Sequence, residues 1–218
     1  MNTDRLQSLR QAGIVAVLRA PSPDAALAAV DALVAGGITG LEVTYSTPDA
    51  PAVIAETLRR HPSAYVGAGT VRSAADAEAA VSAGASFLVS PGTTPRVAAA
   101  MVATGVVSMT GALTPSETMT ALEAGVEVVK LFPASSAGPA FLRALRAPFP
   151  EVAFMPTGGN DAAAIGPWMD AGAIALGAGG DLVPSSALAP TVDADELVRR
   201  AALFSGALRV WRTEADRG

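Results

Sequence analysis

Residues 128–134 (VVKLFPA) place Lys130, the chain's single lysine, within a run of apolar and β-branched residues. Such a run predicts a buried strand. A lysine in the middle of that strand either reaches solvent along its stem or lies inside, where desolvation favours the neutral amine. A neutral amine can attack a carbonyl carbon and form a Schiff base. Lys130 is therefore a candidate nucleophile, with a lysine that reaches the surface as the alternative.

Glu42 is a second candidate for chemistry, because residues 40–44 (GLEVT) also predict a buried strand. Burial favours the protonated form of a carboxyl group, so Glu42 could move protons near neutral pH. An amine nucleophile and an acid/base group are what imine chemistry requires. The alternative is a structural ion pair between Glu42 and Lys130, which is costly to bury.

Other polar residues and glycines follow further predicted strands. Arg19 could bind a carboxylate or a phosphate through its planar guanidinium, or it could be a surface arginine. Thr70 and Thr157 could hydrogen-bond a substrate or only satisfy the backbone of a turn. The glycine-rich segments 157–159 and 177–180 could bind an anion through backbone N–H groups, or could simply be tight turns.

These groups can act together only on a scaffold that gathers the ends of the strands. The chain repeats a short apolar run, a turn and an alanine-rich amphipathic stretch that glycine often closes. Strands are expected to begin near Gly13, Gly40, Tyr65, Phe87, Val106, Val128, Ala153 and Ile174. Helices are expected over 5–11, 23–35, 49–60, 73–83, 95–104, 115–124, 139–147, 161–171 and 193–210. Glu117 is expected to cap the helix that follows Thr114.

Strands that alternate with helices at this short spacing predict parallel βαβ units with right-handed crossovers. Eight such units predict a single-domain (β/α)8 TIM barrel over residues 1–218, with a short N-terminal helix. A doubly wound open sheet is the alternative. It is disfavoured because residues 17–21 (VLRAP) after the first strand carry no Gly-x-Gly-x-x-Gly pattern.

Composition argues against several classes of function. The net charge of -5 and the lack of a basic cluster argue against nucleic-acid binding. The absence of cysteine excludes disulfides and thiolate metal sites, and a metal site built on histidine is not expected with His61 as the single histidine. No apolar run approaches a membrane span and the N-terminus lacks the apolar core of a signal peptide. We expect a cytoplasmic protein without metal or cofactor that does not bind membranes.

Six motifs in order carry a resemblance to a known family. They are residues 41–44 (LEVT), 66–71 (VGAGTV), 89–92 (VSPG), 113–117 (LTPSE), 130–134 (KLFPA) and 156–159 (PTGG). Together they resemble the 2-keto-3-deoxy-6-phosphogluconate (KDPG) and 4-hydroxy-2-oxoglutarate (KHG) aldolases, class I enzymes on a (β/α)8 barrel. The resemblance extends from about Gly13 to Pro184.

The resemblance implies roles for individual residues. Lys130 would form the Schiff base and Glu42 would be the general acid/base. Substrate contacts would come from Arg19 on the carboxylate or nearby polar groups, Thr70 and Pro91 near the pyruvyl part, Phe132 beside the imine, and Thr44 and Thr157. Phosphate would be held by Gly158, Gly159, Gly179 and Gly180. The reaction would be reversible cleavage of a phosphorylated keto acid to pyruvate and glyceraldehyde 3-phosphate without metal, and the protein would be a homotrimer.

Two positions depart from the KDPG pattern. Ser46 stands where those enzymes typically have an arginine, and Gly180 stands where they usually have a serine. The segment around Ser46 and residues 135–139 resemble the 2-keto-3-deoxy-6-phosphogalactonate (KDPGal) aldolases instead. The alternatives are a KHG aldolase, a phosphosugar-binding or isomerase barrel that uses Glu42 as a base without imine chemistry, and a non-catalytic barrel.

Overall fold

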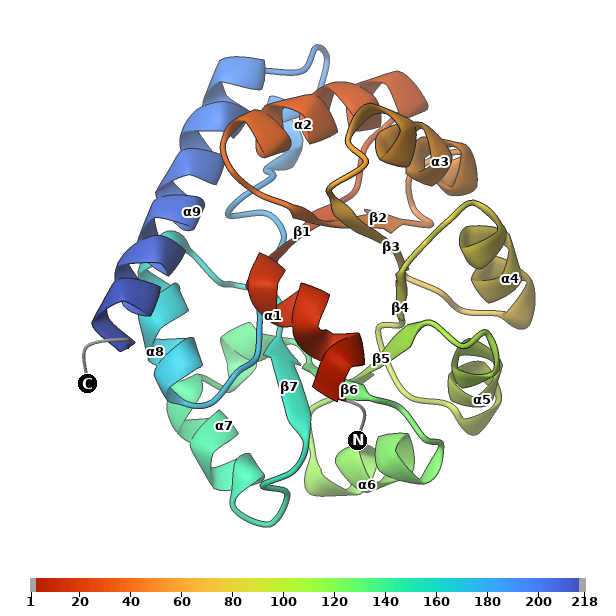
Figure 1. The fold of residues 1–218 in the computed structure, drawn as a ribbon, viewed down its shortest axis with the longest axis vertical. Coiled ribbons are helices and arrows are strands. Elements are labelled where there is room, and N and C mark those ends of the chain that lie inside the picture. Colours follow the sequence, from red (N-terminus) through yellow and green to blue (C-terminus); the bar gives the residue numbers. More distant parts are fainter. Residues whose placement is uncertain (1–2, 216–218) are drawn as a thin grey trace.

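Eight parallel strands form the predicted barrel, with helices on its outside (Figure 1). The computed structural model describes residues 3–215. The strands are β1 (Ile14–Leu18), β2 (Gly40–Thr44), β3 (Tyr65–Gly69), β4 (Phe87–Val89), β5 (Val107–Ala112), β6 (Val128–Leu131), β7 (Ala153–Pro156) and β8 (Leu176–Ala178). Each strand pairs with the next from β1 to β7, and β8 pairs with β1. A bridge between Thr157 and Gly177 links β7 to β8, so the barrel is nearly closed.

The helices follow the strands as the sequence predicts. They are α1 (Gln7–Ala12), α2 (Pro23–Ala35), α3 (Ala50–Arg60), α4 (Ala74–Ser82), α5 (Pro95–Ala103), α6 (Pro115–Glu123), α7 (Pro139–Arg146), α8 (Ile165–Asp170) and α9 (Ala194–Ala215). Short 3-10 turns occupy Thr3–Leu6, Ala134–Ser136, Ala162–Ala164 and Ser185–Ala187. Within residues 3–215, no helix combines the length and the apolar character that crossing a membrane requires.

The start of α6 shows why a helix begins there. The Thr114 hydroxyl accepts the backbone N–H of Glu117, and the Glu117 carboxylate accepts the backbone N–H of Thr114 in return. This reciprocal capping satisfies donors that lack partners inside the helix. The predicted capping role of Glu117 is confirmed. Its hydrogen bonds from the Leu113 N–H and from Thr114 hold the pKa of Glu117 below the ordinary glutamate value.

Successive side chains of each strand point alternately into the barrel and toward the helices outside it. The barrel interior is apolar, with Phe87, Met109, Val128 and Met155 in one cluster. The opposite face packs against the helices, and its cluster includes Leu41, Val43, Val129 and Leu131. Residues two apart share a face, so Lys130 points into the barrel with Val128. Glu42 also points inward, because its neighbours Leu41 and Val43 face the helices.

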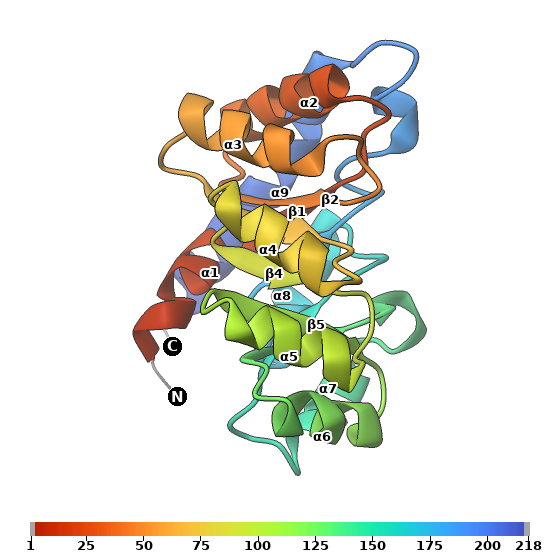
Figure 2. The ribbon, with the colours of Figure 1, turned by 90° about the vertical axis from the view of Figure 1, so that its right-hand side faces the viewer.

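The N-terminal helix covers one end of the barrel. In Figures 1 and 2, α1 lies across the end of the strands, away from their outer ring of helices. Leu6 and Leu9 pack with residues near the beginnings of the strands, including Val128 and Ala153. Arg5 reinforces this contact through an ion pair with Glu127 at 3.0 Å. The barrel is therefore plugged at its amino-terminal end, which leaves the carboxyl-terminal end for a site.

The helix expected over 5–11 begins as the 3-10 turn Thr3–Leu6 and continues as α1. Two predicted helices near the C-terminus also differ in extent from those observed. The stretch expected over 161–171 is broken into a 3-10 turn and α8, because Pro167 in the first turn of α8 has no backbone N–H to donate to the carbonyl of Ala163, as a continuous helix would require. The last helix runs to Ala215, beyond the expected end at residue 210. Trp211 of this extension donates to Asp170 at 2.8 Å, so packing against α8 stabilises the added turn.

Candidate active site

Lys130 and Glu42 face each other inside the barrel. Lys130 of β6 is 3% exposed and Glu42 of β2 is 0% exposed. The Nζ atom of Lys130 lies 3.8 Å from Oε1 of Glu42. The alternative of a lysine at the surface does not fit this burial. Inside an apolar wall, little water screens the interaction between these two side chains.

The carboxylate of Glu42 is buried, and within residues 3–215 neither of its oxygens has a hydrogen-bond partner. Unpaired buried carboxylate oxygens are costly in a purely structural role, and a bound ligand can satisfy them. Gly69 at the end of β3 makes this placement possible, because a Cβ atom there would overlap the Glu42 side chain.

The lysine is flanked by an aromatic ring and by another glycine. The centroid of the Phe132 ring lies 5.2 Å from Nζ of Lys130, as the resemblance implied for a residue beside the imine. Gly111 of β5 pairs with Lys130 in the sheet, and an added Cβ atom would overlap the backbone of Pro91. Pro91 is thereby brought close to the strand next to the lysine.

Arg19 lies at the mouth of the barrel and bridges three strand ends. Its Nη1 atom donates to the Ser46 hydroxyl at 3.0 Å and to the Thr70 hydroxyl at 3.2 Å. Thr44 lies 2.7 Å from Ser46, hydroxyl to hydroxyl. Thr70 has a positive φ of 58°, an uncommon conformation for a β-branched residue. Such strain is typical of functional sites.

The two predicted phosphate turns leave neighbouring strands. Gly158 and Gly159 adopt positive φ angles of 95° and 71° after β7. The Asn160 side chain ties this turn to both strands, because its amide donates to the carbonyls of Pro156 at 3.1 Å and Gly177 at 3.2 Å. A Cβ atom at Gly179 or at Gly180 would meet nothing within 4 Å, so this second turn borders open space.

The structure thus places the predicted residues at the carboxyl-terminal ends of strands, but only some of them touch. Direct contacts join Lys130 to Glu42 and to Phe132, and Arg19 to Thr70. Thr157 bridges to Gly177 of β8, the strand that precedes the second turn. Sequence reasoning missed the roles of Gly69 and Asn160. The only available signal was their position, one residue before Thr70 and one after the Gly-Gly pair.

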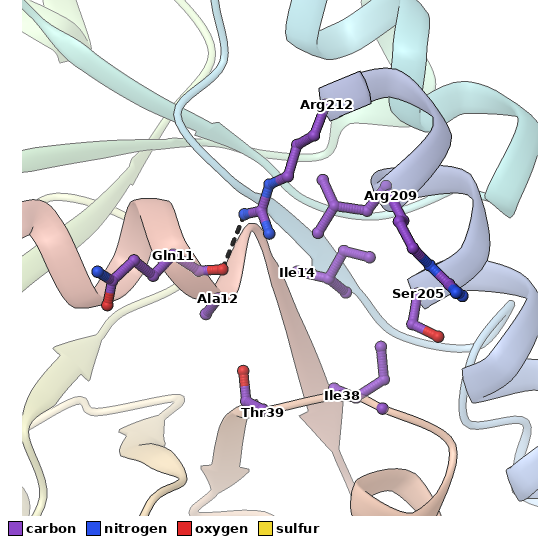
Figure 3. Close-up of a pocket in the computed structure, with 10 residues that line it drawn as sticks. Gln11, Ala12, Ile14, Ile38, Thr39, Ser205, Arg209 and Arg212 are labelled. Carbon is purple, nitrogen blue, oxygen red and sulfur yellow. Dashed lines mark hydrogen bonds between the residues drawn. The ribbon is translucent and has the colours of Figure 1, made fainter. Parts of the chain in front are cut away.

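Two cavities lie at opposite ends of the barrel. One, of about 390 Å³, is lined by the loops after β3 and β4, including Pro91 and Arg72, and therefore adjoins the mouth. The other, of about 410 Å³, lies between α9 and the amino-terminal ends of β1 and β2 (Figure 3). Ile14 and Ile38 are among the residues that line this second cavity. Beside them, Arg212 donates a hydrogen bond to the Gln11 carbonyl at 2.8 Å. Active sites of such barrels occupy the carboxyl-terminal face, so we assign chemistry to the mouth.

Across residues 3–215, no three His, Asp or Glu side chains gather in a way that could hold a metal ion. Tyr45, next to Thr44, is half-buried, and burial together with the nearby Asp76 charge raises its pKa to about 12. Tyr45 is therefore neutral at physiological pH and donates its hydroxyl proton to the Asp76 carbonyl.

A comparison with protein families agrees with this geometry. The model of a family described as KDPG and KHG aldolase matches residues 6–199. The chain belongs to this aldolase family. The sequence resemblance to this family is confirmed.

Individual relatives come from both branches that the motifs suggested. The chain is 40% identical over 159 residues to the 2-dehydro-3-deoxy-phosphogluconate aldolase of Pseudomonas aeruginosa, covering 72% of each chain. It is 33% identical over 171 residues to the 2-dehydro-3-deoxy-6-phosphogalactonate aldolase of Escherichia coli K12, covering 78% of this chain and 83% of that one.

One of the similar solved structures contains a captured reaction intermediate. It is the crystal structure of KDPG aldolase from Legionella pneumophila, with pyruvate captured at low pH as a covalent carbinolamine intermediate. It matches with a TM-score of 0.80 and 28% identity, covering 96% of this chain and 98% of that one. The KDPG and KHG aldolase fold is therefore shared over almost the whole chain.

Proposed function

We propose that this chain is a class I aldolase that cleaves KDPG or its galactonate epimer reversibly to pyruvate and glyceraldehyde 3-phosphate. The observation that carries the proposal is the buried Lys130 beside Glu42, 3.8 Å apart at the barrel mouth. The relatives named as KDPG and KDPGal aldolases support the substrate class. The carbinolamine captured in the Legionella enzyme supports the type of chemistry.

The proposed reaction begins at the substrate keto group. Nζ of Lys130 attacks the C2 carbonyl carbon, and Glu42 delivers the proton that turns the carbonyl oxygen into the carbinolamine hydroxyl. The nitrogen, protonated by the attack, returns a proton to Glu42, and Glu42 passes it to the hydroxyl. The hydroxyl then leaves as water, and the iminium that remains is an electron sink. A base then removes the proton of the C4 hydroxyl, the C3–C4 bond breaks, and its electron pair enters the iminium. Glyceraldehyde 3-phosphate leaves as the aldehyde.

The second half of the reaction releases pyruvate. The enamine that remains on Lys130 takes a proton at C3 and becomes an iminium again. Water adds to its carbon, and the collapse of the resulting carbinolamine frees pyruvate and the amine. Glu42 is suited to each of these proton transfers because its oxygens have no partners within residues 3–215.

The remaining site residues bind the two ends of the substrate in this proposal. Arg19 and Thr70 contact the carboxylate, while Thr44, Pro91 and Thr157 line the path to the imine. The phosphate lies against the backbone N–H groups of Gly158, Gly159, Gly179 and Gly180. Support comes from the positive φ angles of the first turn, the open space beside the second and the bridge between their strands.

The test is pyruvate release, side by side, from KDPG, its galactonate epimer and 4-hydroxy-2-oxoglutarate. We expect one of the two phosphorylated acids to be cleaved fastest, and Lys130→Ala to abolish cleavage while the far-ultraviolet circular dichroism is retained. Fastest cleavage of 4-hydroxy-2-oxoglutarate would favour a KHG aldolase instead. No pyruvate from any of the three, or full activity in Lys130→Ala, would refute the proposal.

Assembly and location stay predictions. We propose a homotrimer, as the resemblance implies, and a cytoplasmic location, as the sequence predicts. Sedimentation of the purified full chain at micromolar concentration tests the first. A mass of three chains would agree with the prediction, and a mass of one chain would contradict it.

A further inference from the structure

We propose that Ser46 is a positioning residue: its hydroxyl holds the Arg19 guanidinium at the barrel mouth, where that group binds the substrate carboxylate. This inference rests on the proposed function and extends it to a residue that departs from the KDPG pattern. Ser46 itself need not touch the substrate, because its effect is transmitted through Arg19.

Each hydroxyl has one proton to donate, and this determines which groups donate and which accept in the hydrogen bonds around Ser46. The Thr44 hydroxyl donates its single proton to the Leu18 carbonyl, 2.8 Å away, because a carbonyl oxygen can only accept. The 2.7 Å bond between Thr44 and Ser46 must then be donated by Ser46. The lone pairs of Ser46 are left to accept from Nη1 of Arg19 at 3.0 Å. The hydroxyls thus form a directed chain from Arg19 to the β1 backbone.

A second hydroxyl fixes the same guanidinium nitrogen from the other side. Thr70 accepts from Nη1 of Arg19 at 3.2 Å, so this nitrogen is held between the ends of β2 and β3. Within residues 3–215 the hydrogen bonds of Arg19 use Nη1 alone. The Nε and Nη2 atoms, which lie on one edge of the guanidinium, stay free for two parallel bonds to a carboxylate.

The neighbouring Thr47, rather than Ser46, holds the loop after β2 in place. Substitution of Ser46 can therefore test the positioning of Arg19 without loosening the loop. Thr47 is 2% exposed and accepts the backbone N–H of Ala20 at 3.0 Å, so it ties the loop after β2 to the loop after β1. Ser46 is exposed and packs into no apolar cluster. Loss of its hydroxyl should therefore leave the loop in place and free only the arginine.

The experiment measures how borohydride trapping of pyruvate on the full chain depends on pyruvate concentration. In Ser46→Ala we expect the half-saturating pyruvate concentration to rise roughly tenfold, since a hydrogen bond to a charged group is lost. The trapping rate at saturation should stay within about twofold, because the lysine is untouched. Ser46→Thr keeps the hydroxyl and should restore the wild-type value.

A double-variant comparison shows whether Ser46 acts through Arg19. In an Arg19→Met background, the added Ser46→Ala change should raise the half-saturating concentration no further. Two results would overturn the positioning role while the aldolase proposal stands. One is a wild-type half-saturating pyruvate concentration in Ser46→Ala, and the other is a roughly tenfold rise on adding Ser46→Ala to Arg19→Met. No trapped adduct in the wild-type chain at any pyruvate concentration would overturn both.

Discussion

The Nζ atom of Lys130 lies 3.8 Å from Oε1 of Glu42, beyond ordinary hydrogen-bond distance, and both groups are buried. The two side chains come from β6 and β2, on different parts of the barrel wall. In the proposed mechanism, this gap leaves space between the two side chains for the oxygen atom on the carbon that the lysine attacks.

Replacement of Glu42 by glutamine should slow catalysis without preventing imine formation entirely. A positioned acid/base group contributes about 10²–10⁴-fold to rate, so kcat for pyruvate release should fall within that range in Glu42→Gln. The amide is similar in size and neutral, so the fold should be kept. Steady-state kinetics measures the effect, and a loss of less than about threefold would argue against the acid/base role.

Gly69→Ala should reduce kcat through Glu42 rather than through the lysine. A methyl group there would overlap the Glu42 carboxylate, which must then turn away from Lys130. A displacement of about 1 Å at a reacting group can reduce rate by about 10²-fold. The matched control is Gly206→Ala in α9, where the nearest atom to an added Cβ lies 3.9 Å away at the end of Arg209. Equal kinetics for the two variants would contradict this account.

Thr70 combines backbone strain with a binding contact, and two substitutions separate them. Thr70→Gly removes the unfavourable φ of 58° but adds chain entropy to the unfolded state. Its free energy of unfolding should therefore stay within about 1 kcal/mol of wild type, while KM rises because the hydroxyl that accepts from Arg19 is lost. Thr70→Ser keeps that hydroxyl and should keep KM. A normal KM in Thr70→Gly would show that the hydroxyl is dispensable.

Glu117 should make a pH-dependent contribution to stability. Hydrogen bonds from Leu113 and Thr114 lower its pKa in the folded chain, so its contribution is present above the ordinary glutamate pKa of about 4.3. The contribution is lost as the pH falls through the lowered folded-state pKa. Glu117→Ala should lower the free energy of unfolding by about 1 kcal/mol at pH 7 and by progressively less in acid. Urea unfolding at a series of pH values measures this difference.

The control for the capping prediction is Glu78→Ala. Glu78 is exposed on α4 and makes no side-chain hydrogen bond within residues 3–215. Its replacement should change the free energy of unfolding by less than about 0.5 kcal/mol. A Glu117→Ala effect that stays constant from pH 7 into acid would rule out the carboxylate as its source.

The barrel could be predicted from sequence because its signals are local. Glycine after many of the helices and an apolar or β-branched run after it indicated the alternation. The apolar runs around Lys130 and Glu42 predicted buried strands, with a lysine at the surface as the alternative. The break before α8 and the extra turn of α9 were less accessible. The first depends on a proline within a helical pattern, and the second on the distant contact between Trp211 and Asp170.

The finer parts of the candidate site depend on contacts between distant segments. That Arg19 would bond to Ser46 and Thr70 rather than point to solvent follows from the stagger of three strands, which no single motif specifies. The space that Gly69 leaves for Glu42 is likewise a relation between neighbouring strands. Sequence motifs predicted the candidate reacting groups, and the structure adds the contacts that surround them.

The most direct test of the central claim is borohydride reduction of the wild-type chain with pyruvate, followed by peptide mass spectrometry. Lys130 is the chain's single lysine, so the peptide that contains it is the one side-chain amine site to examine. We predict one reduced pyruvyl group on that peptide, and none in Lys130→Met or when pyruvate is omitted. Complete turnover of a keto-acid substrate with no adduct on Lys130 would contradict the Schiff-base mechanism.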